Sequence, residues 1–138
     1  MVLEILLLML LAHCIDDFVL QVVLAKLKQK DWWTENGYVT EQNQLYKDDY
    51  KMALFLHSLE WSIMIHLPIM FFCDLYTIHL ALSVGINCLI HYIVDDAKAN
   101  KKTISLVTDQ QIHIMQILVT LSVIVIMSMI TNFEAWVA

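Results

Sequence analysis

The sequence predicts an all-α protein, a polytopic four-helix transmembrane bundle with cytoplasmic loops and a single domain over residues 1–138. Hydrophobic residues make up 59% of the chain and charged residues only 16%, whereas ordinary globular domains are about 45–50% apolar and about 25% charged. The chain holds only 2 glycines and 1 proline, so it has few of the turn signals that a multi-strand fold needs. Its apolar residues fall into long stretches separated by polar ones.

Four apolar stretches approach the length of about 20 residues that a bilayer-spanning helix requires. We expect the spans at about residues 2–25, 52–69, 75–94 and 110–136. Pro68 and Asp74 mark a tight turn between the second span and the third. The ring of Trp136 is expected to anchor the last span at the far membrane interface.

The lysines predict the orientation in the membrane. All 8 basic residues are lysines, and all lie in the two polar loops, 26–51 and 95–109. Because cytoplasmic loops carry the excess of lysine and arginine, we expect both loops in the cytoplasm, both termini outside, and the chain in the inner (cytoplasmic) membrane. The same rule is the simplest explanation for Lys98, Lys101 and Lys102, of which only Lys98 is in phase with His91.

The charge and the cysteines exclude other classes of protein. The net charge is −6 and arginine is absent, which speaks against a nucleic-acid partner because such binding needs a basic face. The 3 cysteines are odd in number and lie in apolar stretches, which is typical of reduced packing residues rather than a disulfide framework. The partner that this composition predicts is the lipid bilayer.

Each predicted span carries polar side chains at helical spacing. In the third span, Asn87, His91 and Asp95 recur at i, i+4 and i+8 and so line one face, with Lys98 one short turn further on. The other stripes are His13 with Asp17 and Gln21, His57 with Glu60, and Asp109 with Gln110 and His113. The predicted topology places all of these stripes in the cytoplasmic half of the membrane.

Charged side chains at this depth are expected to face one another. A charged group at the bilayer centre costs about 2.5–3.5 kcal/mol on insertion scales, whereas each aliphatic residue contributes roughly −0.3 to −0.6 kcal/mol. The stripes should therefore converge on one pocket that opens toward the cytoplasm. Simpler roles are open for three members, because Asp95 and Asp96 suit an interface and Asp109 suits the N-cap of the last span.

Imidazole and carboxylate groups on facing helices are the means by which four-helix bundles build metal centres. Such a set suits Zn²⁺, Mn²⁺ or Fe²⁺, and aspartate-rich sites also take Mg²⁺. The predicted metal ligands are His13, Asp17, His57, His91, Asp95, Asp109 and His113. His66 and His79 lie in the outer half, where we expect a structural role in which they pair with each other or with Glu4.

One family of small bacterial and phage membrane proteins, domain of unknown function thirty-three-oh-seven, opens with the motif H-x-x-x-D-F-x-x-Q. The chain resembles it in the run His13-Cys14-Ile15-Asp16-Asp17-Phe18-Val19-Leu20-Gln21, and then in order at His57-Ser58, His91-Tyr92-Ile93-Val94-Asp95 with Lys98, and Asp109-Gln110 with His113. The resemblance spans nearly the whole chain and implies a small membrane bundle with a polar constellation. Small residues are more usual in that family where this chain has Asp16, so the role of Asp16 is open.

The leading functional hypothesis is a membrane-embedded, divalent-metal-dependent hydrolase whose site opens to the cytoplasm at headgroup level. A bound ion lowers the pKa of its water toward neutrality and polarises a phosphoryl or acyl oxygen. The residues expected to carry this chemistry are Asp17, His91, Asp95 and Lys98, with Lys98 neutralising an anionic substrate. The depth of the site favours a phosphate or lipid headgroup over a wholly soluble substrate.

Two functions from other classes also fit the sequence. A non-enzymatic interaction protein of phage type would bind and inhibit a host membrane protein through the aromatic-rich loop between Trp32 and Tyr50. A His/Asp relay would instead carry protons or ions, continuing outward through Glu4, His66 and His79. Assembly into a homo-oligomer is compatible with each of the three functions.

Overall fold

The computed structural model describes residues 1–73 and 77–137, with side chains up to residue 130 apart from Thr77. No strand occurs in the described part of the chain, so the all-α prediction is confirmed. The elements are α1 (Val2–Ile15), the π-helix η1 (Asp16–Leu20), α2 (Leu24–Leu27), α3 (Lys30–Glu35), α4 (Asp49–Phe72), α5 (Thr77–Ala99) and α6 (Leu106–Val137).

Three of these helices, α4, α5 and α6, are long and apolar enough to cross a membrane. Their outer faces carry large aliphatic and aromatic side chains, such as Phe71, Leu89 and Ile126, which are 80%, 62% and 57% exposed. Water-soluble monomers rarely expose contiguous apolar surface on this scale. The outer faces are therefore suited to contact with lipid.

The first predicted span is not one continuous helix, and in this respect the prediction for residues 2–25 was wrong. Helix α1 ends at Ile15, the π-helix η1 follows, and residues 21–23 turn the chain before the short helix α2. The helical stretch that α1 and η1 form together ends at Leu20, so it is shorter than each of α4, α5 and α6. The first segment therefore differs from the three long helices.

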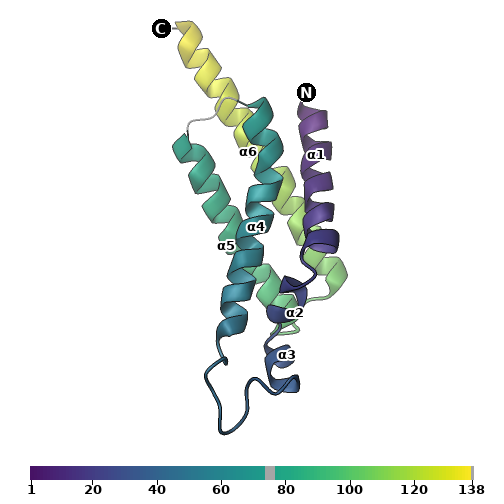
Figure 1. Ribbon diagram of the computed structural model, residues 1–138. Helices are drawn as coiled ribbons and strands as arrows, with labels where there is room; N and C mark the ends of the chain where they lie inside the picture. The colour runs from purple at the N-terminus through teal and green to yellow at the C-terminus, as the bar shows by residue number, and fades with distance from the viewer. Residues whose placement is uncertain (74–76, 138) are drawn as a thin grey trace.

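The helices run antiparallel to their neighbours along the chain, as Figure 1 shows. Helix α4 is central, since it packs against both α1 and α5, while α6 contacts α1 and α5. The two marked termini lie at one end of the bundle, and α3 with the following polar loop lies at the opposite end (Figure 1). The loop between α5 and α6 also lies away from the termini, so both lysine-bearing loops lie toward one end.

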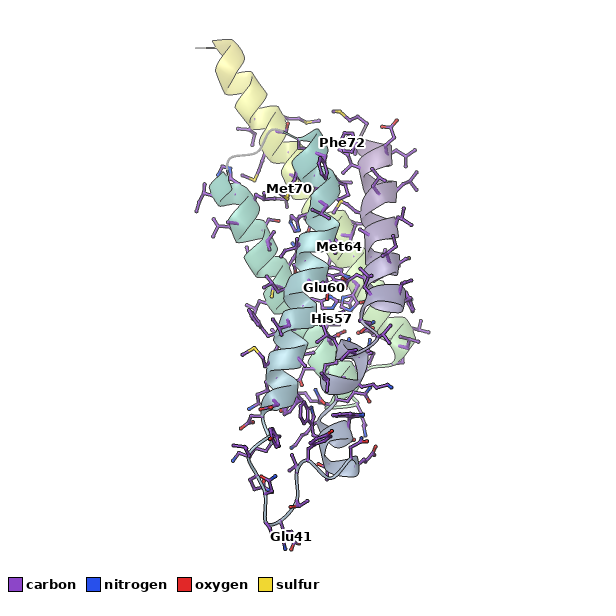
Figure 2. All side chains as sticks on the ribbon, in the orientation of Figure 1. Glu41, His57, Glu60, Met64, Met70 and Phe72 are labelled. Atoms are coloured by element: carbon purple, nitrogen blue, oxygen red, sulfur yellow. The ribbon has the colours of Figure 1, made fainter. Side chains whose placement is uncertain are left out.

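The interior has an apolar half near the termini and a polar half below it. The apolar core comes from α1, α4 and α6 and consists of Ile5, Met9, Trp61, Ile65, Ile69, Ile117, Leu121 and Ile124. Figure 2 shows nitrogen and oxygen atoms gathered between the helices at the level of His57 and Glu60 of α4. Aliphatic packing thus holds the helices together above the polar groups and keeps water away from that side of them.

Two boundary predictions fail for local reasons. Pro68 does not form a turn but lies inside α4, which continues to Phe72; membrane helices tolerate proline because neighbouring groups re-satisfy the freed backbone. Asp109 is not the N-cap of α6, because the hydroxyl of Ser105 accepts the hydrogen bond of the Thr108 N–H at 3.2 Å. Asp74 and the side chain of Trp136 lie outside the described residues.

Candidate metal centre

The polar half of the bundle brings four carboxylates and three imidazoles into one buried cluster. They come from η1, α4, α5 and α6, and none is more than 6% exposed. We call this set the His/Asp cluster, and its members are Asp16, Asp17, His57, His91, Asp95, Asp109 and His113. The predicted convergence of polar stripes from separate helices is present in the structure, and it now includes Asp16.

The π-helix explains why two successive aspartates both face the cluster. In a regular α-helix, neighbouring residues point about 100° apart, so Asp16 and Asp17 would not normally share a face. The wider π-turn at Asp16–Leu20 leaves both carboxylates buried, at 0% and 6% exposed, while Phe18 after them is 63% exposed. Single π-turns of this kind are frequent at functional sites.

The first group within the cluster has the spacing of a metal site. Nε2 of His57 lies 3.2 Å from Nε2 of His91, 3.4 Å from Oδ1 of Asp17 and 3.4 Å from Oδ2 of Asp95. The ligand atoms offered by Asp17, His57 and His91 all lie within 4.8 Å of one another. Ligands placed about 2.0–2.1 Å from a tetrahedral Zn²⁺ are about 3.3 Å apart, so these separations fit a common ion.

A second group adjoins the first and shares His91 and Asp95 with it. Nε2 of His113 lies 3.3 Å from Oδ1 of Asp109 and 3.4 Å from Oδ1 of Asp95. His91, Asp95 and His113 also offer ligand atoms that lie within 4.8 Å of one another. Each of the four residues in this group is fully buried, at 0% exposed.

Many atoms of the His/Asp cluster are near one another without forming hydrogen bonds. Buried atoms that have no hydrogen-bond partner include both oxygens of Asp16, Oδ1 of Asp17, Oδ1 of Asp95, Oδ1 of Asp109 and both ring nitrogens of His113. A buried polar atom left unpaired costs about 1–3 kcal/mol. A cation bound among the carboxylate oxygens and imidazole nitrogens would satisfy several of these atoms at once, so the donor set fits a metal ion.

Two lysines offset part of the negative charge of the cluster. Nζ of Lys28 lies 2.5 Å from Oδ2 of Asp95, and Nζ of Lys98 lies 2.6 Å from Oδ2 of Asp109 and 3.6 Å from Oδ1 of Asp95. With all four carboxylates ionised and the imidazoles neutral, the two ammonium groups leave the cluster with two negative charges. One divalent cation would bring that count to zero.

Lys98 therefore differs from the two lysines that follow it. Lys101 pairs with Asp96 at 2.8 Å, and Lys102 pairs with Asp31 at 2.6 Å, both at the surface. The ammonium of Lys102 holds the pKa of the Asp31 carboxyl below its usual value through their hydrogen bond. Lys101 and Lys102 thus form ion pairs at the surface, whereas Lys98 reaches the cluster as its helical phase indicated.

His13 lies beside the cluster with both ring nitrogens already engaged. Nε1 of Trp61 donates to Nδ1 of His13 at 2.8 Å, which leaves the ring proton on Nε2 facing Oε1 of Gln110 at 3.1 Å. The amide nitrogen of Gln110 then donates to Oδ2 of Asp17 at 3.0 Å and to Oδ2 of Asp109 at 3.1 Å. This chain of bonds suits a supporting role for His13, which was predicted as a metal ligand.

Other polar residues named in the sequence lie apart from the cluster. His66 binds the carbonyl of Ser62 and the hydroxyl of Ser83, each at 2.7 Å, which fits the structural role expected for it. Glu4, one of its two expected partners, pairs with the amino terminus instead. Asn87 joins α5 to α6 by accepting from Gln116 at 2.8 Å and donating to Thr120 at 3.0 Å. Gln21 folds back onto the carbonyl of Asp17.

Sequence reasoning missed two residues of the site. Lys28 was grouped with the other loop lysines, and nothing in its spacing reveals that the turn after η1 carries it back to Asp95. Trp61 was not among the predicted site residues, but its ring stacks on His91 with centroids 4.3 Å apart and its N–H donates a hydrogen bond to His13. A signal for Trp61 was present, because it follows His57 by four residues and therefore shares its helix face.

The predicted pocket open to one side of the membrane takes a different form. His57, His91 and His113 are 0% exposed, so the cluster is closed, and its link to solvent is the side chain of Lys98, which is 25% exposed. A cavity of about 460 Å³ lies instead between α5 and α6, and no member of the His/Asp cluster lines it.

No family model matches this sequence, and it matches neither a curated protein nor a solved structure.

Proposed function

We propose that the protein is a membrane-embedded divalent-metal-binding protein, with an ion held by Asp17, His57, His91 and Asp95. The observation that carries this proposal is the set of separations around Nε2 of His57, which are 3.2 Å to His91 and 3.4 Å to each aspartate. These atoms come from η1, α4 and α5, which are distant in sequence. Two imidazoles and two carboxylates favour Zn²⁺, Mn²⁺ or Fe²⁺ over Mg²⁺, which prefers oxygen ligands and water.

Neighbouring residues support such a site in the way that outer groups support known metal centres. Oδ2 of Asp16 lies 3.7 Å from Nδ1 of His57, on the side of the ring away from Nε2. The separation is longer than a hydrogen bond, so the Asp16 carboxylate acts on the ring through its negative charge, which raises the basicity of the ligating nitrogen. Gln110, itself held by His13, binds Oδ2 of Asp17 and leaves Oδ1 for an ion.

The chemistry that we propose for this site is hydrolysis of a lipid-linked phosphate ester. A divalent ion supplies a water of near-neutral pKa and polarises a phosphoryl oxygen. Lys98 lies at the solvent edge of the cluster and would neutralise the charge of the phosphoryl group, while Asp17, His91 and Asp95 hold the ion. The partly exposed side chain of Lys98 marks the route by which a headgroup would reach the closed cluster.

The cavity between α5 and α6 supports a lipid substrate. Its wall is mainly aliphatic, with Ile86, Ile90, Val119 and Val123 among the lining residues. Ile90 and Ile112 of this wall directly precede His91 and His113 in the sequence, although neither histidine itself lines the cavity. An acyl chain lying there would bring its headgroup close to the metal site.

Metal content tests the binding proposal. The experiment is elemental analysis of detergent-purified protein after loading with Zn²⁺ or Mn²⁺ and removal of free metal. We expect at least one ion per chain in the wild type, loss of bound metal in Asp95→Asn, and full retention in Asp96→Asn, whose carboxylate pairs with Lys101 at the surface. A wild-type protein without bound metal, or an Asp95→Asn variant that keeps it, would contradict the proposal.

Phosphate release tests the reaction separately. Metal-loaded protein in vesicles that contain phosphatidic acid should release inorganic phosphate, and the Asp95→Asn variant should not. The Asp96→Asn variant should match the wild type. A protein that binds metal in the first experiment but releases no phosphate here would remove the hydrolase proposal and leave the metal-binding proposal intact.

The orientation in the membrane is a further part of the proposal. The lysine-bearing loops lie toward one end of the bundle and the termini lie at the other (Figure 1), and the positive-inside rule assigns the loops to the cytoplasm. Alkaline phosphatase fused after Ala138 should then be active, and green fluorescent protein fused there should be dark. The reverse pattern would overturn this orientation.

A further inference from the structure

The two oxygens of Asp95 face two different histidines. Oδ2 lies 3.8 Å from Nε2 of His91, and Oδ1 lies 3.4 Å from Nε2 of His113. The two imidazole rings are stacked, with centroids 4.1 Å apart and planes inclined by 22°. Two nearly parallel imidazole rings thus face the two oxygens of one carboxylate. A carboxylate that bridges two metal ions has this arrangement.

The second of these positions has donor atoms that the first does not use. His113 and Asp109 are each 0% exposed, and Nε2 of His113 lies 3.3 Å from Oδ1 of Asp109. Nε2 of His113, Oδ1 of Asp109 and Oδ1 of Asp95 each lack a hydrogen-bond partner, although they lie close to one another. Three unpaired buried atoms directed at one small region are better explained by a shared cation than by contacts among themselves.

We propose that His113, Asp109 and Oδ1 of Asp95 hold a second divalent ion, so that Asp95 bridges a two-metal centre. This inference rests on the proposed function, since Oδ2 of Asp95 belongs to the first site. The metal ions of two-metal hydrolytic sites lie about 3.5–4 Å apart, which is close to the 4.1 Å that separates the stacked rings of His91 and His113. The two sites together use every ionisable group of the His/Asp cluster except Asp16, which supports His57.

The lysines are compatible with two ions because their shortest contacts leave lone pairs for both, although Nζ of Lys98 also lies 3.6 Å from Oδ1 of Asp95. Lys98 binds Oδ2 of Asp109 and leaves Oδ1 for the ion. Lys28 binds Oδ2 of Asp95, which has a second lone pair for the first ion. With two ions the charge count of the cluster becomes −4 + 2 + 4 = +2, which a bound phosphate dianion would neutralise. The substrate class of the site is therefore a phosphate monoester rather than a neutral ester.

The test is the stoichiometry and magnetic coupling of bound Mn²⁺ in the full-length, detergent-purified protein. The wild type should bind two Mn²⁺ per chain and give the electron paramagnetic resonance spectrum of an exchange-coupled pair. Asp109→Asn and His113→Gln should each halve the Mn²⁺ content and give the six-line spectrum of isolated Mn²⁺. Gln116→Leu, a buried change on the same helix that leaves the cluster intact, should keep two ions.

Every outcome separates the two proposals. One uncoupled Mn²⁺ in the wild type, or two ions in both Asp109→Asn and His113→Gln, would overturn the second position and leave the first site standing. No bound Mn²⁺ or Zn²⁺ in the wild type would overturn both. The wild-type measurement needs no variant, so the inference is tested even where a substitution prevents folding, which circular dichroism would reveal.

Discussion

The ammonium group of Lys28 lies 2.5 Å from Oδ2 of Asp95, although the two residues are 67 positions apart in the sequence. Both side chains are buried, at 6% and 1% exposed. The contact fastens the end of α2 to α5, because Lys28 directly follows α2 and Asp95 lies near the end of α5. It also supplies positive charge at the point where the carboxylates of the cluster meet.

Replacing Lys28 should destabilise the protein. Lys28→Ala leaves the Asp95 carboxylate buried without its closest partner, and breaking a buried ion pair in this way costs about 3–5 kcal/mol. Equilibrium unfolding in mixed detergent should show that loss in metal-free protein, with part of it recovered when Zn²⁺ is added. Lys26→Ala, which removes an exposed lysine two positions earlier, should change the unfolding free energy little; equal effects of the two variants would contradict this account.

Asp16 should tune the affinity of the first site without being a ligand. Its carboxylate lies 3.7 Å from Nδ1 of His57, and removal of such an outer partner typically lowers metal affinity about 10–100-fold. Competition with a chromogenic chelator should show that drop for Asp16→Asn, with the same number of ions bound at saturation. Asp96→Asn, which changes a carboxylate that pairs with Lys101 at the surface, is the control. An unchanged affinity in Asp16→Asn would refute the supporting role.

Trp61 should report metal binding directly. Its ring stacks on His91 at 4.3 Å between centroids and at 26° between planes, so a paramagnetic ion on His91 lies close enough to quench its emission. Titration with Co²⁺ should lower the fluorescence of the wild type in a saturable way. Trp61→Phe keeps Trp32, Trp33 and Trp136 and should lose that quenching; quenching of equal size in both proteins would place the ion elsewhere.

Metal affinity should fall as the medium is acidified. Histidine binds an ion only as the neutral imidazole, so protons compete with the metal as the pH falls. The stabilisation that a bound ion gives to the folded protein is therefore lost on acidification. Isothermal titration between pH 5.5 and 8 measures the trend, and an affinity that rises on acidification would contradict imidazole ligation.

Helical spacing was sufficient to predict much of the candidate site. His91 with Asp95 and Asp109 with His113 are separated by four residues, and each pair faces the cluster as predicted. Four stripes had to meet because charged groups are costly against lipid, and that argument needs no knowledge of which helix packs on which. The same reasoning predicted that His57 of α4 would face the cluster.

The features that the sequence did not predict depend on the local path of the backbone. No glycine or proline marks the change from α1 to η1, so the burial of Asp16 beside Asp17 and the return of Lys28 to the cluster leave no signal in the sequence. Pro68 gives the opposite error, because a residue that normally ends a helix lies inside α4. Both cases are set by tertiary packing rather than by residue preference.

The most direct test of the central claim, that the cluster ligates a divalent ion, is X-ray absorption spectroscopy of the Zn²⁺-loaded protein. The account predicts a first shell of nitrogen and oxygen atoms at about 2.0–2.2 Å with the multiple scattering of imidazole rings, and no sulfur. This signal should vanish in Asp95→Asn and persist in Asp96→Asn. A sulfur shell at about 2.3 Å, which would point to Cys14, Cys73 or Cys88, or a shell without imidazole, would contradict it.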